Sequence, residues 1–104
     1  MKIQIYNSNH KLVTIKGEKV DFYGFEKFQF VLHRKLLPNN QVSKNRWAIS
    51  ETISGRSVYQ SCIRETKKQV TEQAQKILKI NGIKGLQRAI KLALRVRTAK
   101  MKLS

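Results

Sequence analysis

The C-terminal stretch Thr66–Ser104, TKKQVTEQAQKILKINGIKGLQRAIKLALRVRTAKMKLS, combines two patterns. Its apolar residues recur at helical spacing, and nearly all of its charged residues are cationic. It contains 11 Lys and Arg against the single acid Glu72, a net of +10 out of +16 for the whole 104-residue chain. Such an excess repels itself in a compact domain, and an oppositely charged partner relieves that repulsion. The stretch therefore predicts a helical surface with affinity for a polyanion.

Two amphipathic helices are expected in this stretch. Thr66 and Gln69 have the spacing of a capping box at the start of the first helix. Its apolar stripe consists of Val70, Ala74, Ile77 and Leu78. Asn81-Gly82 ends this helix, because glycine adopts the left-handed conformation that closes a helix. The second helix is predicted from about Lys84 to Arg97, with a basic tail over 98–104. Its buried stripe consists of Leu86, Ala89, Ile90, Ala93 and Leu94.

Four cations of the second helix fall opposite that stripe. They are Lys84, Arg88, Lys91 and Arg95, at positions i, i+4, i+7 and i+11 of one helical face. Solvated helix faces ordinarily mix charges of both signs, but no acid follows Glu72. These four residues, supported by Lys67 and Lys68, are the predicted nucleic-acid contacts. An interfacial membrane helix is the less favoured interpretation, because the apolar side is half alanine and lacks Trp or Phe anchors.

The first part of the chain has the alternating pattern of strands. Ile3 and Ile5, then Val13 and Ile15, alternate with polar residues around the turn formers at 7–9, which predicts a hairpin. A further strand is predicted at Phe28, Phe30 and Leu32. Val31 breaks its alternation, so this strand is expected to be covered on both faces over part of its length. A short helix over 25–32 is the alternative.

A second hairpin is predicted over 46–63, after a loop at 36–45 and with its turn near 54–56. With an even-length turn, one face is apolar and belongs to the core. It carries Trp47, Ile49, Ile53, Val58 and Cys62. The other face is solvated or receives a partner. It carries Ala48, Ser50, Thr52, Tyr59 and Ser61. The expected fold is α+β, a single domain over 1–104. An antiparallel sheet of four to six strands, mainly within 1–63, is followed by two C-terminal helices over 66–97, packed on one face.

Several functional classes are not indicated. Cys62 is the only cysteine, so no intrachain disulfide and no cysteine-based zinc site are expected, and a reducing cytoplasm fits best. The N-terminus lacks the apolar segment of a signal peptide, and no run of about 20 apolar residues predicts a membrane span. His10, His33 and the scattered acids form no catalytic or metal-binding spacing. We therefore expect no enzyme, no cofactor and no metal.

Residues 47–78, WAISETISGRSVYQSCIRETKKQVTEQAQKIL, resemble the C-terminal two-thirds of a double-stranded RNA-binding domain. That family has an aromatic-led strand, a turn glycine, a second strand, then Ser or Thr, two lysines and a helix with spaced alanines. The matching residues are Trp47, Gly55, Thr66, Lys67, Lys68, Ala74 and Leu78. In that family the two lysines clamp phosphates across a groove, which implies this role for Lys67 and Lys68. The chain departs from the family in lacking a first helix and in carrying an extra last one. The segment also looks like pieces of small uncharacterised phage and mobile-element proteins of Gram-positive bacteria.

Two hypotheses of different classes follow. The first is non-catalytic binding of an RNA or DNA duplex, mainly through phosphate contacts from the basic C-terminal helical face. The resemblance favours RNA character, and no sequence-specific base contact is indicated. The alternative is a phage or mobile-element protein that binds and inhibits a host protein or ribonucleoprotein, such as an anti-CRISPR. Its candidate contacts, where exposed, are Phe22, Tyr23, Phe25 and Tyr59, although most of these four are expected in the core. The oligomeric state stays open.

Overall fold

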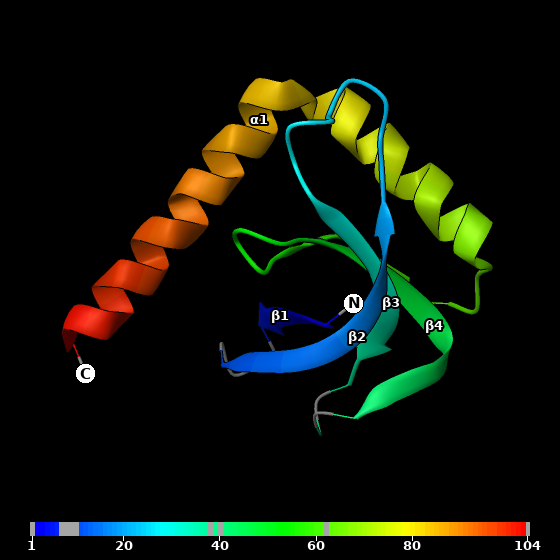
Figure 1. The fold of residues 1–104 in the computed structure, drawn as a ribbon, viewed down its shortest axis with the longest axis horizontal. Helices are drawn as coiled ribbons and strands as arrows, with labels where there is room; N and C mark the ends of the chain where they lie inside the picture. Colours follow the sequence, from blue (N-terminus) through cyan, green and yellow to red (C-terminus); the bar gives the residue numbers. More distant parts are fainter. Residues whose placement is uncertain (1, 7–10, 38, 40, 62, 104) are drawn as a thin grey trace.

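The computed structural model describes residues 2–6, 11–37, 39, 41–61 and 63–103. It is an α+β structure with one five-stranded antiparallel sheet in the order β1-β2-β3-β4-β5. A long, kinked helix follows the sheet, as Figure 1 shows. The elements are β1 (Lys2–Tyr6), β2 (Leu12–Val20), β3 (Phe30–Leu36), β4 (Val42–Glu51), β5 (Ser57–Gln60) and α1 (Lys67–Leu103). The predicted fold class, the antiparallel sheet and both predicted hairpins are confirmed. The loop predicted over 36–45 is shorter than expected, because β4 already begins at Val42. The predicted turn at 7–9 and Cys62 lie outside the described residues.

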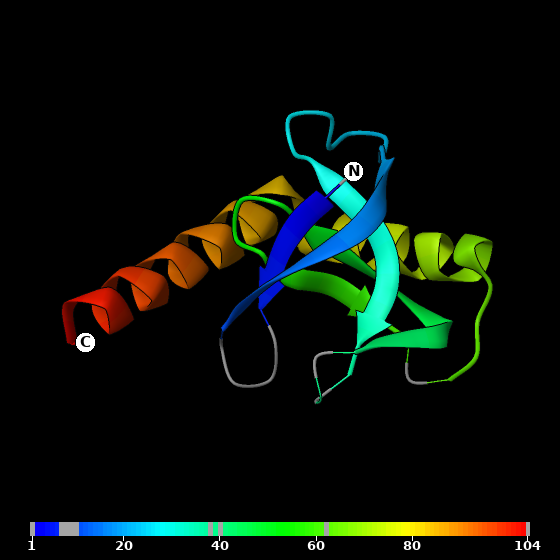
Figure 2. The ribbon, with the colours of Figure 1, turned by 60° about the horizontal axis from the view of Figure 1, so that its bottom comes forward.

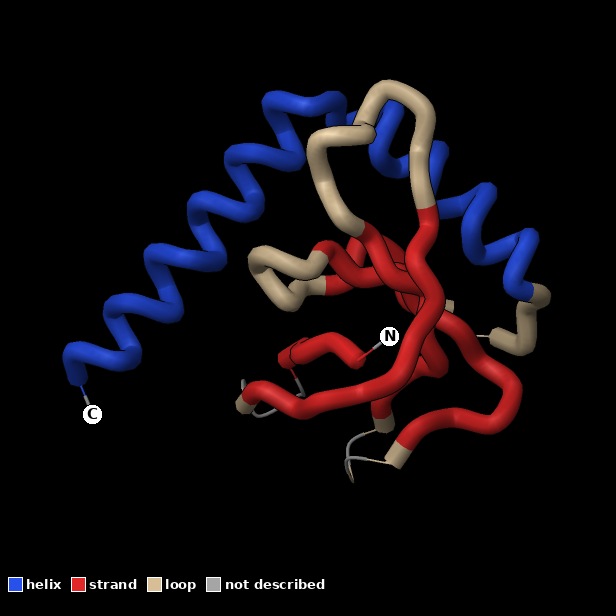
Figure 3. The backbone as a smooth tube through the Cα atoms, in the orientation of Figure 1, coloured by secondary structure: helices blue, strands red, loops and turns tan. Residues whose placement is uncertain are grey.

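Strand β2 is shared between two partners and bends at Gly17. Its first half pairs with β1 from Leu12 to Lys16, and its second half pairs with β3 from Gly17 to Val20. A Cβ at Gly17 would lie only 2.2 Å from Val31 Cγ1 and 2.8 Å from the Leu32 carbonyl oxygen. The absence of a side chain therefore allows β2 to lie close to β3 at Gly17, where the pairing of β2 changes from β1 to β3. Figure 3 shows the β1–β2 hairpin diverging from the other strands.

The sheet buries apolar side chains on both of its faces. Phe30 and Leu32 of β3 face the helix, whereas Val31 between them faces β1, and all three are buried. This confirms the predicted strand that is covered on both sides, and it excludes the alternative helix over 25–32. The strand begins only at Phe30, and Phe28 lies in the turn before it, where its N–H donates to the Phe25 carbonyl. The core on the helix side comprises Phe22, Phe25, Phe30, Leu32, Ile49, Val70, Ala74, Leu78 and Leu86. The core on the other side comprises Ile3, Ile5, Ile15 and Val31.

Of the predicted core face of the β4–β5 hairpin, Trp47, Ile49 and Val58 do pack in or against the core on the helix side, but the predicted division into two faces is otherwise wrong. Tyr59 pairs directly with Ile49, so both point to the core face, and the pairing shifts register between Ile49 and Ser50. The other face is not solvated, because Ala48 and Ser50 are 0% and 1% exposed. Ile53, predicted in the core, is exposed in the turn.

Helix α1 begins as the sequence predicts. The Gln69 N–H donates to Thr66 Oγ1 at 3.1 Å, and the Thr66 N–H donates to Gln69 Oε1 at 2.8 Å. These reciprocal bonds form the predicted capping box, and they satisfy two amides that a helix start leaves without a backbone partner.

The prediction of two separate C-terminal helices is not matched. One helical element runs from Lys67 to Leu103, with a kink at Gly82, whose φ of 69° and ψ of 175° are not helical. We call residues 67–81 the first arm and residues 83–103 the second arm. The helix also continues through the predicted basic tail. Glycine at the kink allows a positive φ that other residues rarely adopt, so the predicted helix end becomes a change of direction.

Only part of the helix packs on the sheet. The first arm runs along the back of the strands (Figure 2), whereas the second arm extends away from them (Figure 1). Of the predicted buried stripe of the second arm, only Leu86 is buried; Ile90 and Ala93 are partly buried, and Ala89 and Leu94 are exposed. The second arm is therefore held to the domain mainly near its start.

Candidate nucleic-acid interface

The four predicted cations of the second arm form one continuous surface, which we call the cationic ridge. Lys84, Arg88, Lys91 and Arg95 are all exposed. At 100° per helical residue they fall within an arc of about 60°, on the side opposite buried Leu86. Within the described part of the chain, none of these four side chains forms a hydrogen bond or an ion pair. Their charges therefore face solvent without compensation.

The surroundings of the cationic ridge make this charge unfavourable in the free protein. Residues 83–103 contain seven Lys and Arg and no Asp or Glu. Like charges spaced by i and i+4 destabilise a helix by about 0.2–0.5 kcal/mol per pair at low salt. A row of phosphates placed along the ridge would replace this repulsion with attraction. The second arm spans about 16 Å from Lys84 to Arg95, a length over which duplex DNA presents roughly nine phosphates.

Lys67 and Lys68 lie at the start of the first arm, and the structure does not bring them to the cationic ridge. Figure 1 places the start of α1 and its second arm on opposite sides of the kink. The Lys67 Nζ donates to Glu18 Oε1 at 2.6 Å and lies 4.8 Å from the ring centroid of Trp47. Lys68 is exposed. The six predicted residues therefore form two sites, and in one of them Lys67 already has an anionic partner.

The sequence did not single out the surroundings of Trp47 as a site. The guanidinium carbon of Arg34 lies 5.4 Å from the Trp47 ring centroid, and Arg34 pairs with Trp47 across β3 and β4. Both residues line a cleft of about 820 Å³ where β2 turns away from β3, together with Lys16 of β2. Finding this cationic and aromatic cleft requires the strand register, which residue spacing does not supply.

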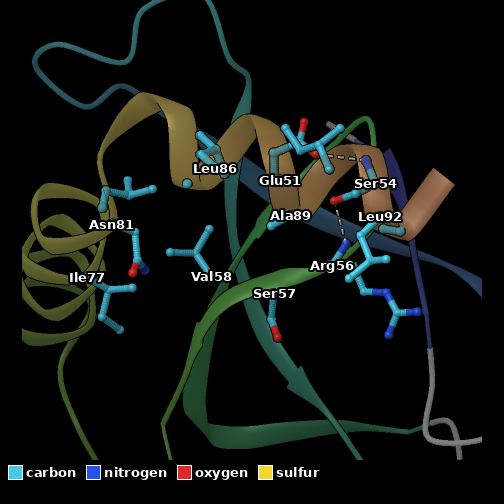
Figure 4. A pocket seen from close by; sticks show the side chains of 14 residues that line it. Glu51, Ser54, Arg56, Ser57, Val58, Ile77, Asn81, Leu86, Ala89 and Leu92 are labelled. Atoms are coloured by element: carbon cyan, nitrogen blue, oxygen red, sulfur yellow. Dashed lines mark hydrogen bonds between the residues drawn. The ribbon is translucent and has the colours of Figure 1, made fainter. Parts of the chain in front are cut away.

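A second unpredicted feature is an apolar groove of about 470 Å³ between the second arm and the β4–β5 hairpin, shown in Figure 4. Val58 of β5, Ile77 of the first arm and Leu86 of the second arm line it. Glu51 also borders the groove, but this residue is only 1% exposed. Its carboxylate accepts hydrogen bonds from the N–H groups of Ile53 and Ser54, both at 2.7 Å, and so holds the turn.

The other candidate residues are the two histidines and four aromatic side chains, and most of those that the structure describes are buried. His33 is buried, with Nε2 at 2.7 Å from Ser50 Oγ and Nδ1 at 2.9 Å from the Arg34 carbonyl oxygen. Burial lowers the pKa of His33, and the bond to the Arg34 carbonyl partly opposes this shift. His10 lies outside the described residues. Of the four candidate aromatic contacts, Phe22 and Phe25 are in the core, Tyr59 is partly buried and Tyr23 is exposed.

Two negative findings concern the described residues alone. Across 2–6, 11–37, 39, 41–61 and 63–103, no three His, Cys, Asp or Glu side chains are grouped so as to hold a metal ion. Nor does a helix in this part of the chain combine the length and the apolar character needed to cross a bilayer.

The fold and the site define a class of molecule: a small α+β domain with a bent antiparallel sheet and a kinked, strongly basic C-terminal helix. Comparison with known proteins finds no match to this chain among family models, curated proteins or solved structures. Its function is therefore inferred from the geometry and charge of the chain itself.

Proposed function

We propose that this protein binds nucleic acid without catalysis, mainly through phosphate contacts from the cationic ridge of the second arm. The observation that supports the proposal is the row of four exposed cations with no ion pair among the described residues, on an arm without a single acid. A row of this kind attracts polyanions over a Debye length, about 8 Å at physiological salt. Lys68, and Lys67 once released from Glu18, are additional contacts.

In the proposed mode of binding, the protein recognises the charge and shape of the nucleic-acid backbone rather than the base sequence. The ridge consists of long flexible side chains along a helix, which suits phosphates whose spacing is the same in every sequence. The resemblance to double-stranded RNA-binding domains favours a duplex of RNA character, since that family recognises A-form backbone across its grooves. We therefore expect duplex RNA to bind at least as tightly as duplex DNA of the same length.

The test is a binding titration against single- and double-stranded RNA and DNA at two salt concentrations. Four phosphate contacts predict a log–log salt slope of about 3.6 on duplex DNA, or roughly a 150-fold loss of affinity for a fourfold rise in salt. Neutralising the ridge with Lys84→Gln, Arg88→Gln, Lys91→Gln and Arg95→Gln should remove most of this slope. Glutamine keeps helix propensity, so the fold should survive.

A matched control removes the same charge elsewhere. Lys2, Lys19, Lys44 and Arg46 are exposed cations of the sheet, and their replacement by glutamine also lowers the net charge by four. The control variant should bind much more tightly than the ridge variant. Equal binding by the two variants would show that only net charge matters and would refute the ridge as the site. A ridge variant that binds like the unmodified protein would refute it as well.

A further inference from the structure

The apolar groove beside the second arm is not explained by phosphate binding. Its walls are contributed by three separate parts of the chain, as Figure 4 shows. Its apolar lining includes Val58, Ile77, Leu86, Ala89, Leu92 and Ala93. Leu92, at its edge, is 62% exposed, and Ala89 is also exposed. Exposed apolar surface of this kind is unfavourable in water, and covering it contributes about 25 cal/mol per Å².

The shape of the groove suits a helix of another protein. Ala89 and Ala93 lie one turn apart and line the groove from the second arm. Because their side chains are small, a second helix can approach this arm closely, at the low end of the roughly 8–10 Å range for packed helices. An amphipathic helix inserts its apolar residues in this way, at i, i+3, i+4 and i+7. Nucleic acid has no comparable apolar projections, and its phosphates would lose hydration against these walls.

The charge around the groove selects an acidic occupant. Arg56 lines one wall, and Arg88 lies on the second arm about 40° around the helix from Leu92. Among the described lining residues the one carboxylate, that of Glu51, is buried and accepts two backbone hydrogen bonds. A second copy of this chain would bring another net +16 and another acid-free second arm to the same place. Carboxylates flanking an apolar stripe would instead complement Arg88, which forms no ion pair among the described residues, and the surplus positive charge of the second arm.

We propose that this groove binds an amphipathic helix of a partner protein that carries an apolar stripe flanked by acidic residues. This inference goes beyond nucleic-acid binding and does not depend on it. The ridge residues lie about 100–160° around the helix from Ala89, so most of the ridge faces away from the groove, and Arg88 lies where the two surfaces meet. A helix in the groove and a nucleic acid on the ridge can therefore be bound together, which would make the protein an adaptor between them.

The probe is a labelled synthetic helix of roughly five turns, with leucines repeating at i, i+3, i+4 and i+7, glutamates beside that stripe, and alanines and glutamines on the opposite face. A control peptide has the same composition with the leucines scrambled, so it keeps the charge and loses the stripe. Fluorescence anisotropy at physiological salt should show at least tenfold tighter binding of the striped peptide, a difference of about 1.4 kcal/mol. Equal binding of the two peptides would overturn the proposal, because charge alone would account for it.

Two variants of equal charge locate the site. Ala89→Glu places a carboxylate in the groove, at an exposed position that tolerates it. Gln87→Glu adds the same charge to the same arm, about 160° around the helix from Ala89. Ala89→Glu should weaken the striped peptide at least tenfold, and Gln87→Glu should change it much less. Equal effects of the two variants would overturn the assignment.

Two further measurements distinguish the groove from the cationic ridge and from a dimer interface. The ridge variant with four glutamines should still prefer the striped peptide over the scrambled one, whether or not it binds nucleic acid. Loss of that preference would place the peptide on the ridge and overturn the groove. Sedimentation equilibrium should show a monomer over the concentrations used. A dimer that Ala89→Glu dissociates would identify a second copy as the occupant and would likewise overturn the proposal.

Discussion

Gly17→Ala should strongly destabilise the protein, because the bend of β2 depends on the missing side chain. The added Cβ would lie 2.2 Å from Val31 Cγ1 and 2.8 Å from the Leu32 carbonyl oxygen. The carbonyl belongs to the backbone of β3 and cannot rotate away, so the two strands would have to separate. Overpacking of this kind costs typically about 1–3 kcal/mol, and backbone contact places Gly17→Ala at about 3 kcal/mol. That is a large share of the roughly 5–15 kcal/mol that usually stabilises a domain.

Urea unfolding followed by the fluorescence of Trp47, the only tryptophan, measures this loss. With a urea dependence of about 1.5 kcal/mol per M, a loss of about 3 kcal/mol lowers the midpoint by about 2 M. Gly24→Ala is the control: Gly24 also lacks a side chain and has a φ of 86°, but nothing lies within 4 Å of a Cβ there. It should cost only the backbone strain, about 1–2 kcal/mol. An unchanged midpoint for Gly17→Ala, or a larger loss for Gly24→Ala, would refute the close approach of β2 and β3.

Two other predictions concern charge. Because burial lowers the pKa of His33 below 6.5, the unfolded chain binds a proton first as the pH falls. The urea midpoint should therefore be constant well above pH 6.5 and should decrease as the pH falls from 6.5 to the folded-state pKa of His33. A His33→Gln variant should lose this decrease. A decrease that persists in the variant would show that another group causes it. Glu18→Gln should release Lys67, raise the affinity for nucleic acid and increase the salt slope by up to about 0.9. The stability of the fold should change little, because the Glu18 and Lys67 side chains are 64% and 47% exposed. Asp21→Asn removes the same charge from a side chain that has no lysine partner among the described residues, and an equal gain in affinity there would contradict the release of Lys67.

Features that depend on near neighbours along the chain follow from the sequence alone. Thr66 and Gln69 are three residues apart, so the capping box forms within a single turn. The turn between β4 and β5, with Gly55 at a φ of 68°, and the non-helical backbone at Gly82 also follow from local preferences. The alignment of Lys84, Arg88, Lys91 and Arg95 requires only the helical repeat, and all four are exposed as expected.

Features that depend on distant residues arise only when the elements pack together. Glu18 and Lys67 are 49 residues apart in the chain, and their ion pair exists only because the sheet brings β2 beside the start of α1. The register shift after Ile49, which turns Tyr59 toward the core, depends on how β4 and β5 pair.

The two surfaces of the second arm show the same division. The cationic ridge can be predicted from helical spacing, because it involves one element and solvent. The groove cannot, because it exists only where the kink at Gly82 directs the second arm away from the sheet and leaves its apolar side partly uncovered. Helical periodicity identifies which residues share a face, but whether that face is covered depends on the packing of elements that are remote in sequence.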